Sequence, residues 1–113
     1  MTGTAVARYR PQETEAGWLG VVVDLARIRG WLVYHTHDSR HSAAGFPDLV
    51  LVRAGRLVFA ELKRNARTER AQARQVTADQ AAWLAALGDV KADAVEVYVW
   101  RPVDWPSVVQ VLT

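Results

Sequence analysis

The stretch DLVLVRAGRLVFAELK, residues 48–63, constrains the fold more than any other part of the chain. Two apolar segments flank a short turn at residues 54–55, a pattern that predicts an antiparallel β-hairpin. With a two-residue turn, this register places Asp48 opposite Glu61. Because strand side chains alternate between faces, Lys63 lies on the same face as Glu61. A hairpin suited to burial therefore carries two carboxylates and an ammonium group at its open end.

Two carboxylates that face each other across a hairpin, with Cβ atoms roughly 5 Å apart, repel one another. They are tolerated when they are solvated, when one is protonated, or when a cation lies between them. Oxygen ligands at this spacing suit Mg²⁺ or Mn²⁺, and Lys63 would then contact an anion held by the metal. In the alternative interpretation, Asp48 only begins a strand after Pro47, and Glu61 and Lys63 occupy a solvated face. A bulge would also shift the pairing by one residue.

The other patterns predict an α/β fold in which helices flank a mixed β-sheet. An apolar repeat at helical spacing ends at Gly30 and predicts a helix over residues 13–29; its members are Trp18, Val22, Leu25 and Ile28. The remaining expected elements are strands over 31–36 and 94–100 and helices over 77–88 and 104–112. The expected order is thus α-β-β-β-α-β-α. Four tryptophans lie in periodic apolar segments and are expected in the core rather than stacked on bases: Trp18, Trp31, Trp83 and Trp100.

The chain has 113 residues, which suits a single domain, expected over residues 13–113 after a flexible segment 1–12. No apolar run approaches the roughly 20 residues needed to span a bilayer, and no signal-peptide core is present. We therefore expect a cytoplasmic protein without membrane contact. Cysteine is absent, which excludes disulfides and thiolate–zinc sites.

The net charge of +2 does not by itself indicate a nucleic-acid partner. Nearly all of the positive charge is arginine, and Lys63 and Lys91 are the only lysines. Arginine suits bidentate phosphate contacts, although the codon usage of a GC-rich genome also explains its abundance.

Pro47-Asp48, followed by a strand, a turn and Glu61-Leu62-Lys63, resembles the PD-(D/E)xK nuclease signature. The flanking segments resemble the VRR-NUC family of that superfamily, and the similarity runs from about residue 15 to the C-terminus. The segments are GWLVYH (30–35), GFPDLVLVR (45–53), QAAWLAALG (80–88) and VYVWRPVDW (97–105). The resemblance implies a restriction-endonuclease-like sheet and a DNA endonuclease that depends on Mg²⁺ or Mn²⁺.

The resemblance also implies a role for each matching residue. Asp48 and Glu61 match the acids that bind the metal and act in catalysis, and the backbone carbonyl of Leu62 is a further implied ligand. Lys63 matches the catalytic lysine, which orients the attacking water and stabilises charge on the scissile phosphate. Glu15 matches an acid of the first helix that joins the metal site.

Two of the implied residues have ordinary alternatives. Glu13 competes with Glu15 for the metal role, and an acid in the first turn of a helix also complements the helix dipole. Gln80 matches a glutamine that contacts water or phosphate, and we count it among the catalytic candidates. The segment from Thr77 to Gln80 is equally well explained as a helix capping box.

The histidines offer a different metal site. His35 matches a family position at a strand end, where it would line the active site and contact nucleic acid. An alternative zinc site would use as ligands His35, His37, Asp38 and His41. We disfavour it, because these ligands fall partly in a loop and the acidic site already accounts for a metal.

The segment 64–76, RNARTERAQARQV, is longer and more basic than the family pattern. Its arginines recur every three to four residues, so one face of a short helix would present them together; they are Arg64, Arg67, Arg70 and Arg74. We expect an arm that contacts the DNA backbone. The alternative is a solvated, mobile surface loop.

Stand-alone copies of this domain resemble phage or prophage nucleases that act on branched DNA, including four-way junctions. Because a junction has two-fold symmetry, the resemblance implies a homodimer with two active sites. The alternatives are a less selective nicking or restriction-like nuclease, a nucleic-acid-binding module on a degenerate nuclease fold, and a subunit that needs a partner protein. The intact set of two acids and a lysine argues against degeneracy.

Overall fold

The computed structural model describes residues 14–37 and 41–113. The segment expected to be flexible, residues 1–12, lies outside the described residues, as do Glu13 and Asp38. The elements in chain order are α2 (Glu15–Ile28), β1 (Leu32–His35), β2 (Leu49–Arg53), β3 (Arg56–Leu62), α3 (Glu69–Gln75), α4 (Ala78–Gly88), β4 (Val95–Trp100), the 3₁₀ turn η1 (Pro102–Asp104) and α5 (Trp105–Leu112). The mixed α/β class is confirmed, and α3 and η1 are additions to the expected order.

The four strands form one mixed sheet in the order β1-β2-β3-β4. β2 is antiparallel to β1 and to β3, whereas β4 is parallel to β3. The predicted hairpin register is confirmed, since the ladder runs from Arg53 opposite Arg56 to Leu49 opposite Ala60. Residues 54–55 both have positive φ, as the favoured two-residue turn requires. No bulge shifts the pairing, so the next residues outward are Asp48 and Glu61.

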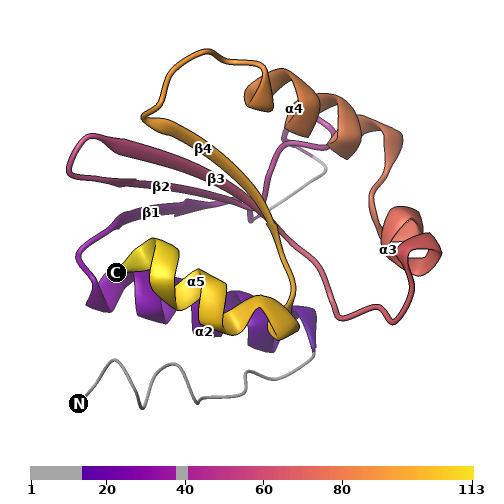
Figure 1. Cartoon of the computed structure of the whole chain (residues 1–113), viewed down its shortest axis with the longest axis horizontal. Coiled ribbons are helices and arrows are strands. Elements are labelled where there is room, and N and C mark those ends of the chain that lie inside the picture. Colours follow the sequence, from indigo (N-terminus) through magenta and orange to yellow (C-terminus); the bar gives the residue numbers. More distant parts are fainter. Residues whose placement is uncertain (1–13, 38–40) are drawn as a thin grey trace.

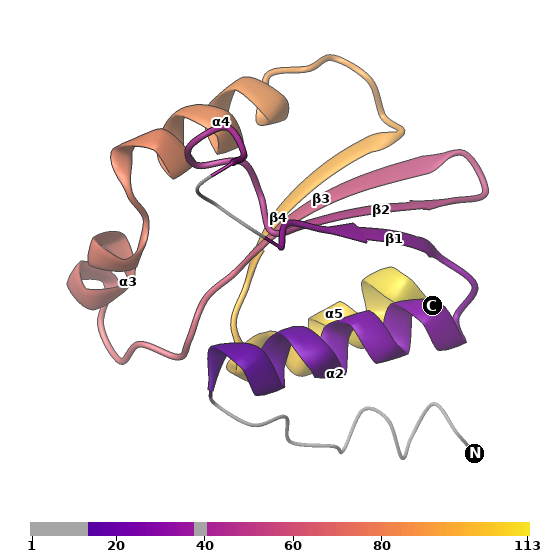
Figure 2. The same cartoon turned by 180° about the vertical axis from the view of Figure 1, so that it is seen from behind.

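Helices α2 and α5 cover one face of the sheet, and α4 lies over the other (Figures 1 and 2). The buried core lies between the sheet and the α2–α5 layer; it includes Trp18, Val22, Leu49, Leu51, Val58, Ala60, Val108 and Leu112. By contrast, α4 has no fully buried residue. No helix in the described part of the chain is long and apolar enough to cross a membrane.

Three of the four tryptophans expected in the core are buried there, namely Trp18, Trp31 and Trp100. Trp83 is a correction: it is half-buried on the α4 side, with its ring edge-on to Phe46 at a centroid distance of 5.0 Å. The expectation fails for Trp83 because its helix packs on a short loop rather than into the main core.

The end of α2 also departs from the expected core. Ile28 is 79% exposed, although its spacing continues the apolar repeat. The helix stops here as predicted, because Gly30 has a φ of 84° and its amide donates to the carbonyl of Arg27. The next amide, that of Trp31, donates to the carbonyl of Ala26. This turn carries the chain into β1 and leaves Ile28 on the outside.

Candidate active site

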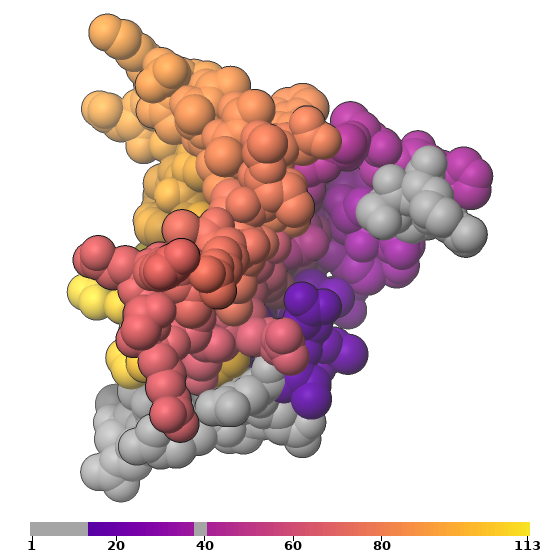
Figure 3. All heavy atoms as spheres, turned by 90° about the vertical axis from the view of Figure 1, so that its right-hand side faces the viewer, coloured from indigo at the N-terminus to yellow at the C-terminus, as the bar shows by residue number. Residues whose placement is uncertain are grey.

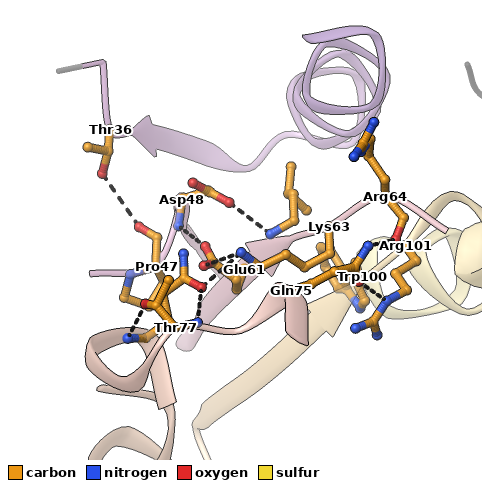
Figure 4. A network of polar contacts seen from close by, with 12 residues as sticks. Thr36, Pro47, Asp48, Glu61, Lys63, Arg64, Gln75, Thr77, Trp100 and Arg101 are labelled. Atoms are coloured by element: carbon orange, nitrogen blue, oxygen red, sulfur yellow. Dashed lines mark hydrogen bonds and ion pairs between the residues drawn. The ribbon is translucent and has the colours of Figure 1, made fainter. Parts of the chain in front are cut away.

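Asp48 and Glu61 meet at the open end of the hairpin, as the register requires. The Asp48 amide donates to Glu61 Oε1 at 3.3 Å, and the Leu62 amide donates to Asp48 Oδ2 at 2.9 Å (Figure 4). The residue that follows β1 also holds this point, because the Thr36 amide donates to the Asp48 carbonyl. Each carboxylate is thus fixed by a backbone amide of the neighbouring strand.

The Glu61 carboxyl group is buried, which makes its charged form energetically unfavourable. Its side chain is 1% exposed, and its Oε2 accepts no hydrogen bond from the described residues. Lys63 Nζ lies 3.5 Å from this oxygen, an ion-pair distance without hydrogen-bond geometry. Burial, and then the contact with Asp48, raises the pKa of Glu61 to about 8, while Lys63 acts in the opposite direction. Such a carboxylate gains from a cation placed beside it.

Gln80 connects the helix end to the lysine. Its Oε1 accepts a hydrogen bond from Lys63 Nζ at 2.8 Å and another from the Thr77 amide at 3.0 Å. The Gln80 amide donates back to Thr77 Oγ1 at 3.1 Å, which completes the capping box. The two interpretations of Gln80 are therefore compatible: the capping box fixes the same oxygen that holds Lys63.

Two cavities meet at these residues. The first, of about 330 Å³, is lined by Glu15, Trp18, Asp48, Leu62, Lys63 and Gln80. The second, of about 280 Å³, shares Asp48 and Gln80 with the first and extends to Thr36, His37, Ser42 and Phe46. In Figure 3 a crevice on this side separates the start of α2 (indigo) from α3 and α4 (red to orange). A chain-like ligand could run through both cavities past Asp48.

The acidic residues fit a divalent ion as a pair rather than as a complete cage. In residues 14–37 and 41–113, no group of three or more His, Asp or Glu side chains is gathered to hold a metal. Asp48 and Glu61 supply adjacent oxygens, one of them buried without a hydrogen bond. Glu15 stands in the first turn of α2 and lines the same cavity. This donor set suits a hard ion that completes its shell with water or substrate oxygens.

The histidines are arranged differently from the expectation. The rings of His35 and His37 lie 3.9 Å apart, and His35 Nδ1 is buried without a hydrogen bond from the described residues. Of the two, His37 rather than His35 lines the second cavity. A zinc site gains no support in the described part of the chain, and its fourth suggested ligand, Asp38, lies outside it.

The basic segment contains an ordered helix, α3, which begins after an N-cap at Thr68. Gln75 anchors it at the other end: its Nε2 donates to the Arg64 carbonyl at 2.9 Å, and its Oε1 accepts from Arg101 Nε at 3.0 Å. Asn65 Oδ1 accepts from the amide of Val103. The segment is therefore tied to the loop that leads into η1 (Figure 4).

The arginines of this segment all remain exposed, at positions Arg64, Arg67, Arg70 and Arg74. Arg70 and Arg74 are one helical turn apart on α3, whereas Gln72 and Gln75 face inward toward their partners. None of the four lines either cavity. The arrangement is compatible with a contact arm beside the site, and DNA contact stays a prediction.

Comparisons with protein-family models, curated proteins and solved structures found no match to this chain.

Proposed function

We propose that this protein is a DNA endonuclease that depends on Mg²⁺ or Mn²⁺ and has a restriction-endonuclease-like core. One observation carries the proposal: Asp48 faces Glu61, and Gln80 accepts a hydrogen bond from Lys63 next to this pair. Asp48, Lys63 and Gln80 line one cavity, whereas Glu61 is buried and does not line it. A buried carboxylate next to a second one costs free energy in a purely structural role. A cation bound between the two groups would offset this cost.

Asp48, Glu61 and the carbonyl of Leu62 would hold the ion, and Glu15 on the wall of the same cavity is a further candidate ligand. A bound divalent ion lowers the pKa of a water ligand and neutralises charge on a phosphate. Oxygen donors without cysteine match the preference of Mg²⁺ and Mn²⁺.

Lys63 supplies a positive charge at the place where a phosphate would bind. Its side chain is only 12% exposed, so its charge acts with less screening by water. Gln80 accepts one of its three protons, which leaves the others for a water molecule or a phosphate oxygen. In this proposal Lys63 orients the attacking water and stabilises the charge that develops on the phosphate.

The substrate in this proposal is DNA, most specifically branched DNA such as a four-way junction. The exposed arginines of α3 would contact phosphates on one side of the crevice, a contact that carries no sequence information. A selective resolvase requires two active sites in a homodimer, and this part of the proposal rests on the family resemblance.

The test is cleavage of a labelled panel comprising a four-way junction, a flap, a splayed arm, a duplex and a single strand, each with Mg²⁺ and with Mn²⁺. We expect paired cuts in the junction, abolished by EDTA and reduced roughly 100-fold or more by Lys63→Ala. Lys91→Ala is the matched control, because Lys91 is the only other lysine and is exposed.

The other outcomes of this cleavage test lead to different conclusions. Cutting of every substrate would keep the nuclease and remove the branch selectivity. Cutting that survives Lys63→Ala would contradict the proposed site. DNA binding without cutting under either metal would favour the binding module or a missing partner protein.

A further inference from the structure

A glycine in the segment before β2 lies directly against the backbone of α4. Gly45 has a φ of +82°, and a Cβ at this position would lie 2.6 Å from both the Asp79 carbonyl oxygen and the Gln80 amide nitrogen. Real Cβ atoms do not approach backbone this closely. Gly30 and Gly55 also have positive φ, but a Cβ at either would meet nothing within 4 Å. Among these three glycines, Gly45 is the one at which the missing side chain permits a contact between two elements.

Helix α4 has no fully buried residue of its own, and it contacts β4 as well as the segment around Gly45. Two further contacts come from the residues beside Gly45. Trp83 Nε1 donates to the Ala44 carbonyl at 3.1 Å, and Phe46 packs edge-on against both Trp83 and Phe59. Residues 44–46 thus lie between the helix and β3.

The same contact borders the candidate active site. The Gln80 amide that approaches Gly45 belongs to the residue whose side chain accepts from Lys63. Asp48 follows Gly45 by three residues and lines both cavities with Gln80. A side chain at position 45 would push the first turn of α4 away from the strand that carries Asp48.

We infer that Gly45 is a positioning residue of the proposed nuclease, which acts by setting Gln80 against Lys63. The catalytic part of this inference rests on the proposed function, whereas the contact between Gln80 and Lys63 can be tested without activity.

The test compares Gly45→Ala with Gly30→Ala. Both variants place alanine in a left-handed backbone, which is unfavourable for an L-residue, but only the first meets another backbone. Protein labelled with ¹³C at lysine Cε gives two NMR signals, because Lys63 and Lys91 are the only lysines. We expect Gly45→Ala to move the Lys63 signal as Gln80→Ala does, with Lys91 unmoved, and Gly30→Ala to move neither.

Junction cleavage provides the second readout. Gly45→Ala should lower kcat roughly 10- to 100-fold with little change in KM. Added to Gln80→Ala it should cause almost no further loss, because both changes remove one interaction. Fully additive losses, or a Lys63 signal unchanged by Gly45→Ala, would overturn the inference.

If Gly45→Ala does not fold, Trp83→Phe tests the same contact, since it removes the hydrogen bond to Ala44 and keeps a ring against Phe46. It should move the Lys63 signal in the same direction, and an unmoved signal would overturn the inference. If the lysine signals behave as expected but the protein cuts no DNA, the positioning role of Gly45 stands. That result would contradict only the nuclease proposal.

Discussion

Glu61 makes the stability of the protein depend on pH. Burial and the neighbouring Asp48 raise its pKa from 4.5 to about 8, so the folded state binds a proton that the unfolded state releases. The stability linked to this proton is fully present below the unfolded pKa and is lost as the pH rises through the folded pKa. Without metal, we expect the unfolding temperature to fall between about pH 5 and about pH 8, by about 5 °C or more.

Thermal unfolding in EDTA across this pH range measures the effect. Glu61→Gln should flatten the curve, because the amide cannot ionise, whereas Glu69→Gln, at an exposed position, should leave the slope unchanged. Adding Mn²⁺ at the alkaline end should stabilise the wild-type protein and not Glu61→Gln. A wild-type curve without slope would contradict the assignment of a costly buried carboxylate.

At the residue scale, the sequence predicted the pairing of Asp48 with Glu61 because strand alternation and a two-residue turn leave little freedom. It could not choose between the two roles of Gln80, since the capping pattern is local and the contact with Lys63 is not. The contribution of Gly45 was not readable at all. It consists of the absence of a side chain opposite a backbone segment more than thirty residues away.

At the element scale, the backbone of the hairpin turn is strained at Ala54, and a substitution there can relieve the strain. Ala54 has a φ of 50°, in a region where an ordinary side chain costs roughly 1–2 kcal/mol. Asn-Gly is the preferred pair for this turn. We expect Ala54→Asn to raise the midpoint of urea unfolding, with a gain of about 0.5–1 kcal/mol. Ala54→Val should lower the midpoint, and equal midpoints for the three proteins would mean that the turn is not strained.

Helix α3 is expected to contribute phosphate contacts rather than catalysis. Replacing Arg67, Arg70 and Arg74 with alanine in a Lys63→Ala background should weaken DNA binding about equally for all sequences. Each lost contact should reduce the slope of log K against log salt by about 0.9. Fluorescence anisotropy at several salt concentrations measures this slope. Arg27→Ala, an exposed arginine at the end of α2, is the control, and an unchanged slope in the triple variant would exclude α3 as a DNA arm.

Strands and the longer helices were predictable because their apolar periods of two and 3.6 are strong signals. The exceptions are places where a tertiary contact decides. α3 is a short helix whose ends are fixed by Thr68 and by the bridge from Gln75 to Arg101. Trp83 continues an apolar pattern, but its helix packs on residues 44–46 instead of the main core.

At the scale of the whole molecule, the two ends of the β2–β3 hairpin have different structural roles. At the closed end, Arg53 and Arg56 face each other without a severe penalty, because their guanidinium groups donate to the last carbonyls of α5 and the C-terminal residue. Arg56 also forms an ion pair with Glu96 at 2.7 Å. The closed end is thus pinned to the helical layer. The open end, held between β1 and α4, is where the candidate site residues converge.

Residues 14–37 and 41–113 of one chain contain one candidate site, so the proposed symmetric cutting of a junction would require two copies. We expect light scattering to give twice the 12.6 kDa mass of the chain, at least in the presence of junction DNA. Wild-type protein mixed with an excess of Lys63→Ala should then form hybrid dimers that nick one strand, because only one subunit can hydrolyse its phosphodiester. Nicked junctions should accumulate in proportion to the hybrid fraction. A monomer that still makes paired cuts, or a mixture whose nicked product never rises, would show that the two cuts are independent events and that the dimer is not the active form.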